Sequence, residues 1–162
     1  MKNLTYLLFI ILGLNACSQP RVVITDEEIP EEVFYLPDQV KPFSGQCVIY
    51  FANSEVIKEE MNYKNGLLHG EMISYYRNGN TRRQGHFLDG KMDGKWDSWY
   101  QNGTKRYTAC YVNDTLNGEF IEWYDTGVLK GKGLYAQNKP MGNWVAYDEA
   151  GMIVKNELYD NN

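Results

Sequence analysis

The sequence predicts an all-β protein, an elongated antiparallel β-meander of about five repeated β-hairpins in a single twisted layer. Two observations lead to this prediction. From Tyr63 onward, glycines and aromatic residues recur with a period of 24 residues. The chain also has 15 glycines, 13 tyrosines and 4 tryptophans but only 5 prolines. Short strands rich in aromatic residues and joined by glycine turns have this composition, whereas long helices do not.

The N-terminus, residues 1–16, is predicted to be a lipoprotein signal peptide. Lys2 supplies a positive charge, and the apolar residues 4–14 form a stretch too short to span a bilayer stably. The run Leu14-Asn15-Ala16-Cys17 resembles the bacterial lipobox. That resemblance implies cleavage before Cys17 and acylation of this cysteine, including palmitate. Several acyl chains would anchor the protein to a membrane of the bacterial cell envelope, and because Ser18 is not acidic we expect the outer membrane.

A tether is expected to follow, so that residues 17–42 comprise the lipidated cysteine and an acidic, proline-containing segment. Residues 18–42 hold four prolines and six acidic residues against two basic ones. The repeat domain is expected over residues 43–162. Its first unit, residues 43–62, is degenerate, and the 24-residue units begin at residue 63.

The repeat is visible in columns of equivalent residues spaced 24 apart. One glycine column is Gly70, Gly94, Gly118 and Gly142, and the aromatic column is Tyr63, Phe87, Tyr111, Tyr135 and Tyr159. In each unit a run of about six residues meets Asn-Gly or a glycine-containing equivalent, and a second run follows. This is the strongest short-range signal for a β-hairpin, so each unit is predicted to be one hairpin that contacts mainly its neighbours.

These units carry a family resemblance. The segments Tyr63-Lys64-Asn65-Gly66, His69-Gly70-Glu71, Tyr75-Tyr76 and Asn78-Gly79 resemble the MORN-repeat variant of many bacterial proteins, including the YwqK-family proteins labelled antitoxins. The resemblance covers residues 43–162 and implies the hairpin fold. The third unit departs with Asn113-Asp114 in place of Asn-Gly, and the last has Asp148 where a tyrosine is usual. We expect those two units to turn or curve differently.

A register follows if Asn78-Gly79 and its equivalents are two-residue loops. Large side chains then face small ones in three units: Met72 faces Gly85, Trp96 faces Ala109 and Phe120 faces Gly133. Trp144 facing Glu157 departs from this pattern. We assign these residues, with Tyr76, Tyr100 and Tyr124, to the better buried, concave face.

On the opposite face the same register predicts an aromatic–basic strip. It pairs Tyr75 with Arg82, Trp99 with Arg106 and Trp123 with Lys130. Cation–π contacts of this kind could simply stabilise a thin sheet. Alternatively, rings and positive charges on an acidic protein could form a binding surface for a glycan or an anionic envelope polymer. The sequence leaves both interpretations open.

The two cysteines of the repeat region are predicted to be free thiols. Cys47 lies on the first predicted strand and Cys110 on the sixth, so five strand spacings place them roughly 24 Å apart. A disulfide needs Cα atoms within about 7 Å. No metal-binding, nucleotide-binding or nucleophile motif occurs, so we predict no catalytic residue, no metal site, no cofactor and no enzymatic activity.

These observations favour a non-catalytic, membrane-anchored envelope lipoprotein whose repeat sheet is a scaffold for a protein partner. A net charge of -5 argues against a nucleic-acid partner. The first alternative is a glycan- or peptidoglycan-binding module that uses stacked Trp and Tyr side chains. The second alternative is an antitoxin- or immunity-like protein.

Overall fold

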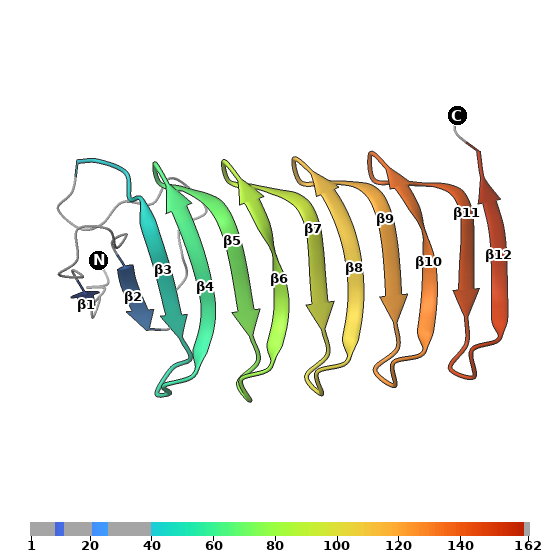
Figure 1. The fold of residues 1–162 in the computed structure, drawn as a ribbon, viewed down its shortest axis with the longest axis horizontal. Coiled ribbons are helices and arrows are strands. Elements are labelled where there is room, and N and C mark those ends of the chain that lie inside the picture. The colour runs from blue at the N-terminus through green and yellow to red at the C-terminus, as the bar shows by residue number, and fades with distance from the viewer. Residues whose placement is uncertain (1–8, 12–20, 26–39, 161–162) are drawn as a thin grey trace, which may run out of the picture.

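The computed structural model describes residues 9–11, 21–25 and 40–160, and every regular element in these ranges is a β-strand. Twelve strands of this part of the chain form one open sheet in sequence order (Figure 1), which confirms the predicted all-β meander. The strands are β1 (Phe9–Ile11), β2 (Arg21–Thr25), β3 (Gly45–Tyr50), β4 (Ile57–Lys64), β5 (Leu67–Tyr75), β6 (Thr81–Leu88), β7 (Lys91–Trp99), β8 (Lys105–Val112), β9 (Thr115–Trp123), β10 (Leu129–Ala136), β11 (Lys139–Tyr147) and β12 (Ile153–Tyr159).

The N-terminal strands β1 and β2 lie in segments for which the sequence predicts a signal peptide and a tether. Strand β2 pairs in parallel with β3, and Val22 of β2 is only 1% exposed beside Cys47. Residues 21–25 therefore belong to the sheet, and the side chain of Val22 extends its core. The predicted cleavage and lipidation site at Cys17 lies outside the described residues. Nowhere in the described ranges is there a helix of the length and apolarity needed to cross a membrane.

Successive hairpins are joined by tight two-residue turns in which both residues have positive φ. These turns are Asn65-Gly66, Asp89-Gly90, Asn113-Asp114 and Gln137-Asn138. Positive φ at both positions defines a type I′ turn, which matches the twist of the flanking strands. Asn113 and Asp114 have φ of 49° and 65°, and Asn and Asp tolerate this region better than other side chains. The expectation that the third unit turns differently is therefore wrong.

The loop inside each repeat is longer than the two residues expected from the sequence. In the first complete unit, Gly79 N donates to Tyr76 O at 2.9 Å and Tyr76 N donates to Asn80 O at 2.8 Å. Three residues thus form the loop, a turn that ends on a glycine with positive φ. A β-bulge follows, since the register shifts by one between Ser74 and Tyr75. The other three complete units repeat this shift.

Because of the bulge, the predicted register is wrong next to the loops, but it is confirmed in the rest of each hairpin. The body of each hairpin pairs as predicted, with Met72 opposite Gly85, Trp96 opposite Ala109 and Phe120 opposite Gly133. Trp144 lies opposite Glu157, also as predicted. Next to the loops the prediction is wrong. Tyr75 pairs with Thr81 rather than Arg82, Trp99 with Lys105 rather than Arg106, and Trp123 with Leu129 rather than Lys130.

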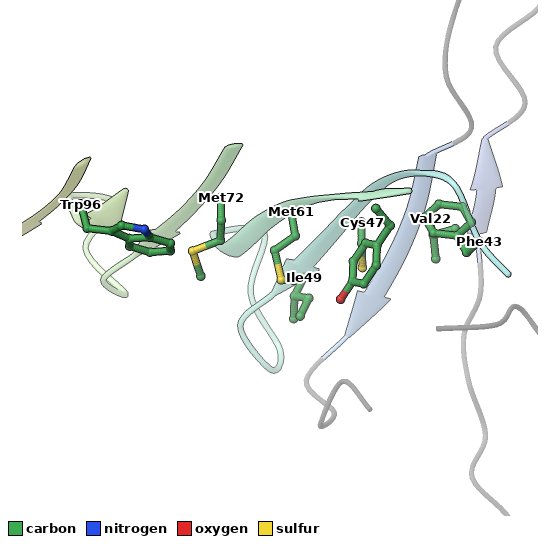
Figure 2. Packing of buried hydrophobic residues seen from close by; sticks show 8 residues of the cluster. Val22, Phe43, Cys47, Ile49, Met61, Met72 and Trp96 are labelled. Atoms are coloured by element: carbon green, nitrogen blue, oxygen red, sulfur yellow. The ribbon is translucent and has the colours of Figure 1, made fainter. Parts of the chain in front are cut away.

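The core follows one face of the sheet as a row of side chains (Figure 2). This row comprises Val22, Phe43, Cys47, Ile49, Met61, Tyr63, Met72 and Trp96, each 6% exposed or less. Burial then decreases along the chain, and the equivalent rings Phe120 and Trp144 are only partly buried. Cys47 lies on β3 and Cys110 on β8, and both are free thiols as predicted.

Tyrosine hydroxyls tie each repeat to the next one. Tyr76 donates to Trp99 O at 2.8 Å, Tyr100 to Trp123 O at 2.9 Å and Tyr124 to Tyr147 O at 2.9 Å. The last unit has Asp148 at this position, where the carboxylate accepts hydrogen bonds from the backbone of its own loop. The loop itself keeps the same backbone bond, Gly151 N to Asp148 O, as in the other units. The expected difference in this turn is therefore also wrong, and only the ladder of tyrosines ends there.

Candidate functional site

The structure divides the predicted aromatic–basic strip between the two faces of the sheet. A β-bulge places two consecutive residues of one strand opposite a single residue of the other, so it changes the face on which the following side chain lies. Arg106 Cζ accordingly lies 5.7 Å from the ring centre of Tyr100, and Lys130 Nζ lies 5.8 Å from that of Tyr124. Arg82 lines a hollow together with Tyr76.

The aromatic half of the predicted strip stays on the other face and acquires a different cation. Lys105 Nζ lies 5.6 Å from the ring centre of Trp99 and 5.9 Å from that of Trp123, so one lysine bridges two repeats. The same lysine forms an ion pair of 2.9 Å with Asp97. We refer to Trp99, Lys105 and Trp123 as the tryptophan ladder. Both indole rings are partly exposed.

Burial and hydrogen bonds shift the pKa values of two side chains beside the tryptophan ladder. Burial alone would raise the pKa of Asp97, but hydrogen bonds from Thr108 and Lys105 outweigh it and hold the pKa below its usual value. Nearby on the same face, the Tyr75 hydroxyl donates to Glu60 at 2.9 Å. Burial and this hydrogen bond raise the pKa of Tyr75 to about 12. Asp97 is thus ionised and Tyr75 protonated at neutral pH.

The displaced arginines meet on the better buried face in a hollow of ≈ 160 Å³, which we call the arginine pocket. Its walls come from strands β4 to β8 and include two buried serines. Its lining residues are Glu59, Ser74, Tyr76, Arg82, Arg83, Ser98, Arg106 and Tyr107. Two of its arginines, Arg82 and Arg106, belong to the predicted binding residues, but they now lie away from Tyr75 and Trp99.

A second hollow, of ≈ 310 Å³, lies further along the same face, and we call it the C-terminal groove. Its rings include Phe120, Trp144 and Tyr159. Phe120 stacks on Trp144 with ring centres 6.0 Å apart. Lys130, the remaining cation of the predicted strip, lines this groove and bonds Glu122 at 2.9 Å. That hydrogen bond raises the pKa of Lys130.

Metal-ligating residue types do not converge in the described ranges. No group of three or more His, Cys, Asp or Glu side chains there could hold a metal ion. The two histidines, His69 and His86, have ring centres 6.4 Å apart, and His69 Nδ1 lies 3.0 Å from Asp89 Oδ1. These contacts tie the turn at Asp89 to the neighbouring strand.

Sequence reasoning missed both the arginine pocket and the C-terminal groove. The adjacent arginines Arg82 and Arg83 were a visible signal, but on a regular strand they would point to opposite faces. Only the bulge brings them together. The groove lies at the last strands of the described sheet and depends on how the side chains of several strands meet.

Comparison with protein families supports the resemblance of the repeats. Residues 68–89, 92–113 and 116–137 each match the family model described as MORN repeat variant. Each match begins in the first strand of a hairpin and ends in the turn that leads to the next hairpin. No curated protein matches the chain significantly.

Proposed function

Because residues 68–137 consist of three repeats of the MORN variant family, we propose that this chain is a non-catalytic repeat scaffold that docks a protein partner. In this proposal a lipid on Cys17 anchors it to the bacterial cell envelope, at the outer membrane. The partner binds at the C-terminal end of the sheet, over the C-terminal groove and strand β12.

The exposure of apolar side chains on and beside β12 is the observation that carries this proposal. Met152 is 66% exposed, Ile153 61%, Val154 62% and Leu158 72%. An edge strand also presents backbone N–H and C=O groups without a partner on its outer side. Exposed apolar side chains on an edge strand are typical of a protein-docking surface, because an added strand pairs with the backbone and covers the side chains.

The C-terminal groove adds aromatic anchors next to this edge. Trp144 and Tyr159 are partly exposed, and Trp144 is held in place because its Nε1 donates to Leu134 O at 2.9 Å. Aromatic side chains held in one orientation lose little entropy on binding, and they are enriched among residues that dominate protein interfaces. The groove and the edge together therefore form one continuous candidate interface.

Site-specific photocrosslinking in intact cells tests the docking proposal. A photoreactive phenylalanine analogue is introduced at Tyr159 or Val154, which both line the C-terminal groove, and at Glu119 as a control. Glu119 is exposed in the same half of the sheet, and strand alternation places it on the face opposite Phe120. We expect a discrete crosslinked protein from the first two positions and none from Glu119. No crosslink at either test position, with the protein present at normal levels, would refute the proposal.

The lipid anchor needs its own test. Cys17→Ala should abolish incorporation of labelled palmitate and release the protein from the membrane fraction. Cys110→Ala, which removes a thiol from the sheet, should leave both unchanged. Membrane association that persists in Cys17→Ala cells would contradict the proposed anchor.

A glycan- or peptidoglycan-binding role is the second candidate, and the tryptophan ladder favours it. Trp99 and Trp123 present partly exposed rings at a spacing set by the repeat, on which sugar faces could stack. Co-sedimentation of the protein with purified peptidoglycan, lost in a folded Trp99→Ala/Trp123→Ala variant, would support this role. An antitoxin- or immunity-like role stays a prediction, which a toxin among the crosslinked partners would favour.

A further inference from the structure

Three guanidinium groups converge on the arginine pocket because of the bulges in β6 and β8. In β6 the register shift makes Arg82 and Arg83, which are adjacent in sequence, line the same hollow. In β8 the equivalent shift brings in Arg106. Arg82 and Arg106 occupy the same position of consecutive repeats and are exposed, whereas Arg83 is partly buried. A ligand can therefore reach all three from solvent.

Within the described ranges, the arginines of the pocket form no ion pair. In the described part of the chain, no carboxylate oxygen lies within the 4.0 Å of an ion pair from any of these three arginines, although Glu59 lines one wall. Two of the guanidinium groups contact aromatic rings instead. Arg83 Cζ lies 4.9 Å from the ring centre of Trp96, and Arg106 Cζ lies 5.7 Å from that of Tyr100. Contact with a ring orients a guanidinium group without using its N–H donors.

Serine hydroxyls complete the polar lining of the pocket. Ser74 is 4% exposed and Ser98 is 5% exposed. The Ser98 hydroxyl donates to Arg82 O at 3.1 Å, which fixes the backbone at the bulge. The structure shows no hydrogen bond from the Ser74 hydroxyl to any described residue, so this buried group is available to a ligand in the pocket.

We propose that the arginine pocket binds a single oxyanion presented by the protein partner, either the carboxylate of an acidic side chain or the phosphoryl group of a phosphorylated one. Guanidinium groups bind both through paired N–H···O bonds. A hollow of ≈ 160 Å³ suits one such group rather than a length of polymer. The assignment of the oxyanion to a protein rests on the proposed scaffold function, whereas binding of a free anion does not.

Titration of the full-length protein in detergent with inorganic phosphate tests the pocket directly. Binding is followed by NMR through the arginine Nε–Hε signals. The test variant is Arg82→Gln/Arg106→Gln, which retains Arg83 because that side chain packs on Trp96. The control variant is Lys91→Gln/Lys139→Gln, which removes the same charge from exposed positions outside the pocket. We expect phosphate to bind about tenfold more weakly to the test variant, from the loss of charge-assisted hydrogen bonds, and with little change to the control.

Equal weakening in the two variants, or no shift of the arginine signals in the parent protein, would overturn the proposal. Capped peptides with a central Glu, phosphoserine or Gln then identify the source of the oxyanion. Binding of the Glu or the phosphoserine peptide, but not the Gln peptide, supports a protein ligand. Binding of phosphatidylglycerol vesicles without either peptide overturns that assignment. If the parent protein does not bind phosphate but still crosslinks at Tyr159, the pocket alone is refuted. If it binds phosphate but gives no crosslink at Tyr159, only the scaffold is refuted.

Discussion

At the scale of single residues, the glycine at position 85 shows how the repeat accommodates a tryptophan. A Cβ atom built on Gly85 would lie 2.1 Å from the Trp96 ring, and one built on Gly133 would lie 2.2 Å from the Trp144 ring. The large ring of one hairpin therefore covers the glycine of the preceding hairpin. The sequence placed Trp96 opposite Ala109 of its own hairpin, which is its partner in register, but its closest glycine lies on β6.

We predict that Gly85→Ala lowers the free energy of unfolding by about 2 kcal/mol, because the Trp96 ring must move away from the added methyl group. Urea unfolding followed by tryptophan fluorescence measures this loss. Gly131→Ala is the matched control, since its Cβ would meet only Val145 O at 3.4 Å. In the presence of Trp96→Leu the cost of Gly85→Ala should shrink. An equal cost in both backgrounds would contradict the contact.

Because of Cys47, we expect the free energy of unfolding to depend on pH in the alkaline range. Burial first, and then the negative charge of Glu59, raise the pKa of Cys47 from 9.0 to about 12. Burial also raises the pKa of Tyr63. The unfolded chain loses these protons at lower pH than the folded chain does. Their contribution to stability is therefore complete below pH 9 and is lost as the pH rises towards 12.

We therefore predict that the free energy of unfolding falls with pH between 9 and 12, and that Cys47→Ala shows a smaller fall. Urea unfolding at a series of pH values measures both slopes. In the native protein, iodoacetamide should leave Cys47 unmodified below pH 9, because the thiolate is the reactive form. Identical pH slopes for the parent protein and Cys47→Ala would show that the buried thiol does not contribute.

At the scale of elements, hydrogen bonds from tyrosine hydroxyls to the backbone connect neighbouring hairpins. They lie at the end of the strands that carries the loop of each repeat, where no turn joins one hairpin to the next. Tyr100 of one repeat reaches Trp123 O of the next. Asn78 and Asn102 add amide bonds of 3.0 Å to Gln101 O and Asp125 O at the same edge. At this end of the strands, side-chain hydrogen bonds therefore connect neighbouring hairpins. At the opposite end, type I′ turns connect them.

We predict that Tyr100→Phe lowers the free energy of unfolding by about 1 kcal/mol, since it removes the hydrogen bond to Trp123 O and keeps the ring. Tyr147→Phe is the control, because Tyr147 accepts through its backbone and its hydroxyl makes no hydrogen bond to a described residue. Its cost should stay within roughly 0.5 kcal/mol. Chemical denaturation of both variants decides, and equal costs would argue against a ladder of tyrosine bonds.

At the scale of the whole molecule, the sheet is stabilised unevenly. Fully buried core residues lie on strands up to β8, whereas the described side chains of β12 are partly or fully exposed. A repeat protein can open from one end, because each hairpin contacts mainly its neighbours. The end with the least burial should open first, and it is also the end to which we assign the partner.

We predict that hydrogen exchange is fastest in β11 and β12 and slowest in β4 to β8. Exchange measured peptide by peptide by mass spectrometry tests this gradient. Binding of the partner at the C-terminal groove should slow exchange in β11 and β12 specifically, since it covers both strands and the outer edge of β12. Uniform protection across all repeats would mean that the sheet unfolds as one cooperative unit, in contradiction to this view.

Much of the fold could be predicted from the sequence, because the features that determine it are local and repeated. The 24-residue period, the glycine columns and the aromatic columns together specify hairpins, their order and the pairing in their middle parts, such as Trp96 with Ala109. The separation of Cys47 and Cys110 followed from the same order. Short turns permit only antiparallel neighbours, so topology required no long-range information.

The tertiary structure decided which residues share a face next to each loop, and hence the candidate sites. One extra loop residue and one bulge move Arg82 and Arg106 away from Tyr75 and Trp99, and Lys105 takes their place between the tryptophans. Such a shift depends on the backbone geometry of a glycine turn, which the residue pattern does not encode. Because side chains alternate between the two faces of a strand, a shift of one residue moves a side chain to the other face. The sequence alone thus determined the meander, while the turn geometry decided its binding surfaces.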